Sequence, residues 1–96
     1  MYIALQGNKQ PAEYIRLAKM IEQLGFDRVY LYDDLFYYPS FPALALMAEH
    51  TTKIEMGPCI VNGLTRHPSI LASNYAFLDA VSGGRAVLGI GRGAFF

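Results

Sequence analysis

The sequence is poor in the features that mark secreted, membrane-bound and nucleic-acid-binding proteins. It has a single cysteine, Cys59, and one thiol cannot form a disulfide within the chain, which favours a reducing compartment. Eight basic and eight acidic residues give a formal net charge of zero, which argues against a nucleic-acid groove or a polybasic membrane patch. No stretch approaches the roughly 20 apolar residues of a membrane span, and the amino terminus lacks the basic lead of a signal peptide. We therefore predict a cytoplasmic protein that acts without nucleic acid or membrane.

Apolar residues, in contrast, are plentiful. They make up 53% of the 96 residues, which is enough for the core of one small domain, in which about 60% of the unfolded surface is buried. No linker, low-complexity tract or change of composition divides the chain. We therefore treat residues 1–96 as part of one domain.

Four short apolar runs recur along the chain at a nearly constant spacing. They cover residues 2–6, 29–32, 54–61 and 86–90, and we predict a strand at each. Pro58 cannot donate a hydrogen bond to a neighbouring strand, so the third strand should bulge or turn near it. The runs are uniformly apolar, as expected of strands that are buried on both faces of a parallel sheet.

The segments between these runs have the apolar periodicity and the boundary residues of helices. A proline suits the first turn of a helix, and a glycine often ends one in the left-handed conformation. The predicted helices begin at Pro11, Pro42 and Pro68, and they end at Gly25, near Thr51 and at 82–84.

Strands that alternate with helices form either a barrel with all helices outside or an open sheet with helices on both faces, and spacing alone does not choose between them. In both folds, the polar residues that follow the carboxyl ends of the strands form the site. In this sequence those residues are Gln6, Asp33, Asp34, Asn62 and Arg92.

Two longer segments, 57–68 and 78–93, together with Gly-Phe-Asp at 25–27, resemble the luciferase-like monooxygenase superfamily. The resemblance is to its branch that uses coenzyme F420, and within it to methylenetetrahydromethanopterin reductases. It implies an α/β fold, the TIM (β/α)8 barrel, of which this chain would hold the first four strands and three helices. Family members are several times longer, and residues 94–96 follow directly after a predicted strand, so we expect an amino-terminal fragment.

The resemblance also implies where the cofactor binds. In that branch the third strand carries a bulge with a non-prolyl cis peptide bond against the deazaflavin ring, and the matching bond here joins Cys59 and Ile60. By the same matching, three strand ends contact the cofactor, through the residues Asp33, Asn62, Arg92 and Gly93.

The catalytic group is not assigned by this matching. Related F420-dependent sugar-phosphate dehydrogenases have a glutamate where Ala94 stands, and methylene reductases commonly have a glutamate where Gln6 stands. The family often has a histidine at the position of Asp34. Because alcohol oxidation needs a base for the hydroxyl proton, these departures argue against it and favour a reductase, with Gln6 and Asp34 as the catalytic candidates.

Simpler structural roles exist for several of these residues. Asp33 and Asp34 could cap the turn that follows the strand, Cys59 could be a small buried apolar residue, and His67 could begin a helix. No spacing of histidine, cysteine and carboxylate residues indicates a metal site.

Three functional hypotheses follow. The first is an oxidoreductase that transfers a hydride between F420 and a small organic substrate. The second is an FMN-dependent monooxygenase of the same superfamily, and the third is a non-catalytic half-barrel or scaffold. Because the first and last strands of a half-barrel have open edges, we also expect a homo-oligomer.

Overall fold

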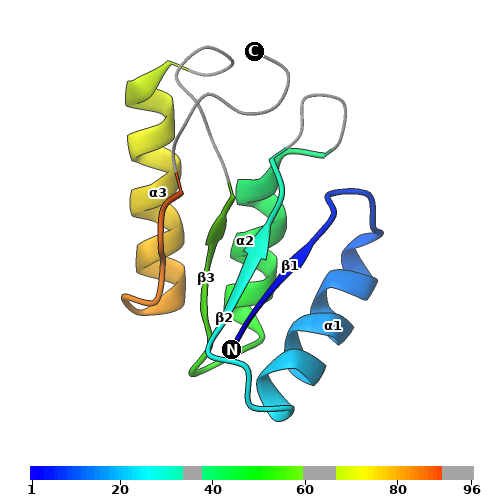
Figure 1. Cartoon of the computed structure of the whole chain (residues 1–96). Coiled ribbons are helices and arrows are strands. Elements are labelled where there is room, and N and C mark those ends of the chain that lie inside the picture. The colour runs from blue at the N-terminus through cyan, green and yellow to red at the C-terminus, as the bar shows by residue number, and fades with distance from the viewer. Residues whose placement is uncertain (34–37, 60–66, 90–96) are drawn as a thin grey trace.

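The computed structural model describes residues 1–33, 38–59 and 67–89. In these ranges strands and helices alternate, and the strands form one parallel sheet in the order β1-β2-β3 (Figure 1). The elements are β1 (Tyr2–Leu5), α1 (Pro11–Gln23), β2 (Arg28–Leu31), α2 (Ser40–Glu49), β3 (Glu55–Pro58) and α3 (Pro68–Ser82). The strand order agrees with the predicted barrel and not with an open sheet in which the order reverses.

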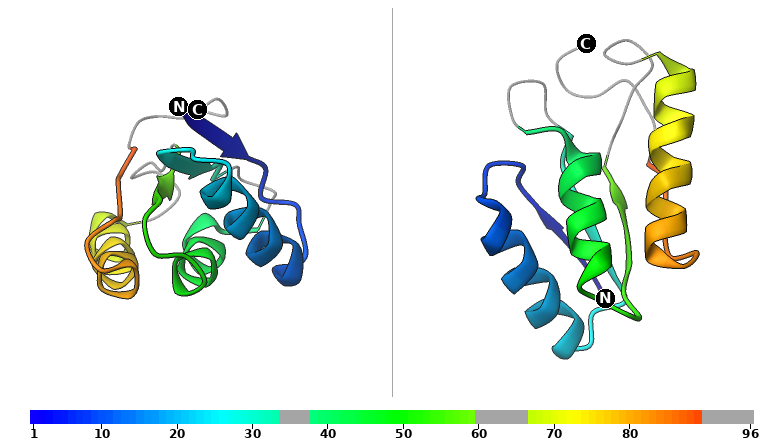
Figure 2. Two further views of the ribbon diagram at one scale, coloured as in Figure 1. Left: turned by 90° about the horizontal axis from the view of Figure 1, so that it is seen from below. Right: turned by 180° about the vertical axis from the view of Figure 1, so that it is seen from behind.

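All three described helices lie on the same face of the sheet (Figure 2). Val29, Leu31 and Met56 are fully buried on that face, where the core also takes in Ala18 of α1 and Leu44 of α2. Successive strand residues point to opposite faces, so the alternate residues of each strand point away from the helices. This arrangement is that of a barrel wall, with its helices outside.

The predicted fourth strand lies beside β3 but is present in the described residues only as a single parallel bridge, between Met56 and Ala86. Met56 accepts a hydrogen bond from the Val87 amide at 2.9 Å, and Gly89 donates one to the Pro58 carbonyl at 3.2 Å. The regular partner of the Val87 carbonyl would be the amide of residue 58, and proline has no N–H to donate. The missing donor explains why the ladder is broken.

Gly57 allows the two backbones to come unusually close at this break. A Cβ atom at Gly57 would lie 1.8 Å from the carbonyl oxygen of Val87. Any side chain at this position would collide with that backbone. The φ angle of Gly57 is not positive, so the restriction is one of space and not of backbone conformation.

The strands β1, β2 and β3 begin within one residue of the predicted runs, β1 and β2 each end one residue earlier than predicted, and the largest difference is at the end of β3. The prediction extended this strand to residue 61, whereas it ends at Pro58. Cys59 still donates its amide hydrogen to Leu31 of β2 at 2.9 Å, and residues 60 and 61 lie outside the described residues.

Two predicted helix ends are confirmed, and one predicted start is wrong. Gly25, with φ of 86°, follows α1, and Gly83, with φ of 67°, caps α3. Helix α2 begins at Ser40 and not at Pro42, because Asp33 accepts a hydrogen bond from the Ser40 amide at 2.9 Å. Pro42 lies in the first turn, where a helix amide has no partner within the helix and none is lost.

Two charged side chains hold the turn between α2 and β3, at the edge of the sheet where the strands begin. Glu22 of α1 accepts hydrogen bonds from the amides of residues 52–54, at 2.7 to 3.0 Å. From the other side, Arg85 donates to the carbonyls of Ala48, Thr51 and Ile54 at 2.8 to 3.1 Å. Partial burial raises the pKa of Glu22, but the three amide donors and the charge of Arg85 outweigh it and lower the pKa below its usual value.

Candidate functional site

The carboxyl ends of the strands meet at one edge of the sheet, as parallel strands require (Figure 1). Gln6, Asp33 and Cys59 follow β1, β2 and β3, and Gly89 lies next to Pro58 through its hydrogen bond. The structure therefore brings three of the predicted site residues to one edge. The other predicted residues lie outside the described ranges; they are Asp34, Ile60, Asn62, Arg92 and Gly93.

Asp33 is held by the amino-terminal end of α2. One of its carboxylate oxygens accepts the hydrogen bond from the Ser40 amide, which is the capping role that the sequence left open as an alternative to cofactor binding. Ser40 itself is fully buried, and its hydroxyl oxygen has no hydrogen-bond partner among the described residues. The aspartate is thus fixed in orientation at the strand edge by a contact with a residue seven positions away.

Gln6 is anchored through its backbone, and the residue itself is exposed. Its carbonyl accepts hydrogen bonds from the Tyr14 hydroxyl and from the Lys9 ammonium group, each at 3.3 Å. The carbonyl of Gly7 accepts a further bond from the Tyr38 amide at 3.0 Å. These contacts tie the loop after β1 to α1 and to the residues that precede α2.

Cys59 is a free, half-buried thiol at the end of β3. Counted by the alternation of strand residues from Met56 in the core, its side chain is expected on the face of the sheet away from the helices. The predicted bulge between Cys59 and Ile60 lies partly outside the described residues, so the prediction stands untested.

A cluster that sequence reasoning missed lies on the same face, near the start of the strands. Arg28 donates hydrogen bonds to Glu55 at 2.8 and 3.1 Å and to the Tyr30 hydroxyl at 2.7 Å. Its guanidinium carbon lies 4.5 Å from the centre of the Tyr2 ring. The bond to Tyr30, and then the bond to Glu55, raise the pKa of Arg28. The strands were expected to be uniformly apolar, whereas this face is polar and aromatic.

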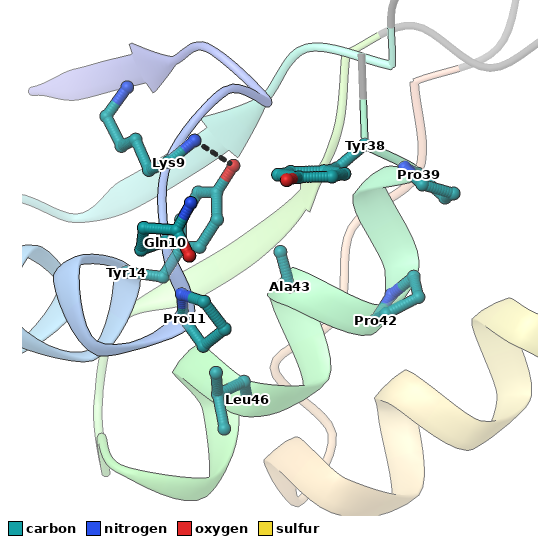
Figure 3. Close-up of a pocket in the computed structure, with 9 residues that line it drawn as sticks. All are labelled: Lys9, Gln10, Pro11, Tyr14, Tyr38, Pro39, Pro42, Ala43 and Leu46. Carbon is teal, nitrogen blue, oxygen red and sulfur yellow. Dashed lines mark hydrogen bonds between the residues drawn. The ribbon is translucent and has the colours of Figure 1, made fainter.

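A cleft of about 510 Å³ opens between α1 and α2, on the helix side of the sheet (Figure 3). Tyr14, Tyr38, Pro42 and Leu46 are among its lining residues, so its walls are mainly apolar. Of the predicted cofactor-binding residues that the structure describes, neither Asp33 nor Cys59 is among the lining residues.

The residues that the structure describes show no grouping of three or more histidine, cysteine or carboxylate side chains that could hold a metal ion. His67 begins α3, where its ring accepts a hydrogen bond from the Ser69 amide at 3.1 Å. Within the same described ranges, no helix has the length and apolar character needed to cross a membrane.

Comparison with known proteins identifies the family. A model of the family described as luciferase-like monooxygenase matches residues 3–96. The chain belongs to this family. The predicted resemblance is thereby confirmed, and the partial α/β barrel architecture is confirmed with it.

Three matches, two of them to a reductase of Methanopyrus kandleri, show which members of the luciferase-like family are similar to the chain. The 5,10-methylenetetrahydromethanopterin reductase of Methanopyrus kandleri is 43% identical over 95% of the chain and 26% of its own length. The structure of the coenzyme F420 dependent tetrahydromethanopterin reductase from Methanopyrus kandleri matches 99% of the chain and 27% of that protein, with a TM-score of 0.94. An F420-dependent glucose-6-phosphate dehydrogenase of Nakamurella multipartita is 32% identical over 86% of the chain and 27% of its own length. The chain thus spans about a quarter of the relatives that it matches.

Proposed function

We propose that this chain forms part of an oxidoreductase that transfers a hydride between coenzyme F420 and a small organic substrate, as a methylenetetrahydromethanopterin reductase does. The observation that carries the proposal is the match to the F420-dependent reductase, with a TM-score of 0.94 and 41% identity over 99% of the chain. Such a match includes the strand ends, and the strand ends of a barrel carry its chemistry.

The described residues fit a flat cofactor ring at the strand edge. The strand ends at Cys59 and Gly89 carry no large side chain, which favours the close approach of a flat ring to the backbone there. Asp33 offers a carboxylate that α2 holds in place. F420, when bound, supplies or accepts the hydride at its deazaflavin ring.

The roles of this chain's residues in the proposal are positioning and binding. Asp33 accepts a hydrogen bond from the cofactor, Cys59 and Ile60 support one face of the ring, and Asn62, Arg92 and Gly93 contact its edge. Gln6 and Asp34 remain the candidates for a group that contacts the substrate. An FMN-dependent monooxygenase is the alternative. We favour F420 because the Nakamurella multipartita dehydrogenase and the Methanopyrus kandleri reductase described above are both F420-dependent.

A chimera tests the proposal because the chain matches only about a quarter of the reductase. Residues 1–96 would replace the matching segment of the Methanopyrus kandleri reductase, and reduction of methylenetetrahydromethanopterin by reduced F420 would be measured. We expect the chimera to be active and Asp33→Ala in it to lower the rate by at least about tenfold, or about 1.4 kcal/mol in transition-state stabilisation. Asp79→Ala, a change to a carboxylate on α3, is the control. A well-folded chimera without F420-dependent activity would contradict the proposal.

We also propose that the protein is cytoplasmic and that it forms a homo-oligomer. The outer edge of β1 is not paired with any described strand, and an open parallel edge invites pairing with another chain.

A further inference from the structure

The side chain of Tyr32 is directed into the barrel from the end of β2. Val29 and Leu31 of this strand are buried in the core under the helices, and successive strand residues point to opposite faces. Arg28 and Tyr30 alternate with them and are joined on the other face by a hydrogen bond of 2.7 Å from the guanidinium group to the phenol oxygen. Tyr32 continues this second set, so its ring is expected on the barrel side, one layer beyond Tyr30.

The hydrogen bonds between the strands extend to the layer that contains Tyr32. Its amide donates to the Leu5 carbonyl at 2.9 Å, and the Cys59 amide donates to the Leu31 carbonyl at 2.9 Å. Beyond the last paired residues of the three strands, the next residues are Gln6, Tyr32 and Cys59, which therefore share one layer. The carboxyl ends of the strands carry the site of a (β/α)8 barrel, so this layer forms part of the floor of the site.

The polar side chains next to Tyr32 along β2 are already engaged. One carboxylate oxygen of Asp33 accepts the hydrogen bond from the Ser40 amide, at the start of α2 and thus on the helix side of the sheet. The Tyr30 hydroxyl accepts the hydrogen bond from Arg28. Within the described ranges, the Tyr32 hydroxyl forms no comparable bond. Tyr32 is therefore the residue at the end of β2 that presents an O–H donor to the interior of the barrel.

We propose that Tyr32 contacts the substrate and gives it a proton during the reduction, an inference that rests on the proposed function. In a methylenetetrahydropterin the methylene carbon bridges two nitrogen atoms. Addition of a hydride from reduced F420 to this carbon breaks one carbon–nitrogen bond, and the electron pair of that bond stays on the nitrogen. This nitrogen takes the phenol proton of Tyr32, and the carbon becomes a methyl group. The cofactor is oxidised by the loss of the hydride and a ring proton, and solvent returns a proton to the phenolate.

The two neighbours of Tyr32 in its layer are less suited to this role. The side-chain amide of Gln6 donates hydrogen bonds but does not give up a proton at ordinary pH, and Cys59 supports the cofactor ring in the proposed function. Tyrosine is one of the side chains that act as general acids, and its ring offers a flat apolar surface on which a pterin ring can pack. Asp34, which lies outside the described residues, is the competing acid and is included in the test.

The test uses the chimera with the Methanopyrus kandleri reductase. Tyr32→Phe removes the hydroxyl and keeps the ring, and we expect it to lower kcat for methylenetetrahydromethanopterin by about a hundredfold, since a general acid contributes about 10²–10⁴-fold. The KM for this substrate and the affinity for F420 should stay within about threefold, because the proton is needed only in the transition state. Tyr38→Phe is the matched control, at a tyrosine of the cleft between α1 and α2, and should leave kcat unchanged.

The possible outcomes separate this inference from the proposed function. In an active chimera, a Tyr32→Phe variant whose kcat changes by less than about twofold would overturn the inference alone, and a large loss of kcat in Asp34→Asn would then assign the proton to that residue. A Tyr32→Phe variant that loses F420 affinity would assign the hydroxyl to the cofactor and would also overturn the inference. A folded chimera without activity would refute the proposed function and this inference together. Circular dichroism checks the folding of each variant.

Discussion

Replacement of Gly57 by alanine should break the contact between β3 and residues 85–89. The new methyl group would lie 1.8 Å from the Val87 carbonyl oxygen and 2.8 Å from a methyl carbon of its side chain. Side-chain Cβ atoms essentially never lie closer than 3.0 Å to such atoms, so the carbonyl oxygen must retreat by about 1.2 Å, the difference between 3.0 and 1.8 Å. Three hydrogen bonds of 2.9 to 3.2 Å join this segment to Met56 and Pro58, and they cannot all survive such a shift.

The expected cost follows from those hydrogen bonds and from the strain. Each hydrogen bond contributes about 0.5–1.5 kcal/mol to stability, and overpacking a core costs about 1–3 kcal/mol. Because relaxation relieves part of the strain, we expect Gly57→Ala to lower the free energy of unfolding by about 2–4 kcal/mol. For a chain of this size the midpoint of thermal unfolding should fall by about 10–30 °C.

Urea unfolding followed by circular dichroism measures the effect. Gly25→Ala is the matched control, because Gly25 has a φ of 86° but no atom within 4 Å of the added methyl group. That control should cost only the left-handed backbone strain, about 1 kcal/mol. Surface substitutions ordinarily change the free energy of unfolding by less than about 0.5 kcal/mol. If Gly57→Ala changes it by no more than that, the claim that an added methyl group collides with the Val87 backbone is refuted.

Three further results are expected. Glu22→Gln should destabilise the chain by about 1–2 kcal/mol at pH 7 in urea unfolding, through weaker bonds to the amides of 52–54. Because the folded-state pKa of Glu22 is lowered, this difference should shrink as the pH falls from about 5 through that pKa. Glu49→Gln, at an exposed residue of α2, is the control and should change the free energy of unfolding at pH 7 by less than about 0.5 kcal/mol. Ser40→Ala should raise the free energy of unfolding by about 1 kcal/mol, because it removes a buried hydroxyl without a described partner; a loss of stability would show that the hydroxyl has a stabilising partner. The isolated chain should show no turnover and no micromolar affinity for F420 or FMN in fluorescence titrations, because a barrel site draws on most of its strand ends; tight binding by a monomer would contradict this.

The alternation of strands and helices was predictable from the sequence because its signals are local. These signals are the apolar runs, the proline at the start of α1 and of α3, and the glycine after each of these helices. Each can be recognised from residues that are close in sequence. The resemblance in segments 57–68 and 78–93 decided between a barrel and an open sheet, which spacing could not do.

The contacts that shape the site depended on residues distant in sequence. The start of α2 was misplaced because Pro42 has the local signal of a first helical residue, whereas the true start depends on Asp33 across a loop. The interrupted fourth strand depends on the missing amide of Pro58, whose consequence for Val87 appears only when the two segments lie side by side. The bond between Arg28 and Glu55 joins residues that are 27 positions apart, and neither residue carries a motif.

Direct cofactor binding by the chimera with the Methanopyrus kandleri reductase tests the central claim that these strand ends form part of an F420 site. The measurement is a fluorescence titration of the purified chimera with F420 and, separately, with FMN. We predict that F420 binds within about tenfold of the affinity of the parent reductase, a difference of less than about 1.4 kcal/mol, and that FMN binds at least about a hundredfold more weakly than F420. A folded chimera that binds FMN as tightly as F420, or that binds neither, would contradict the claim.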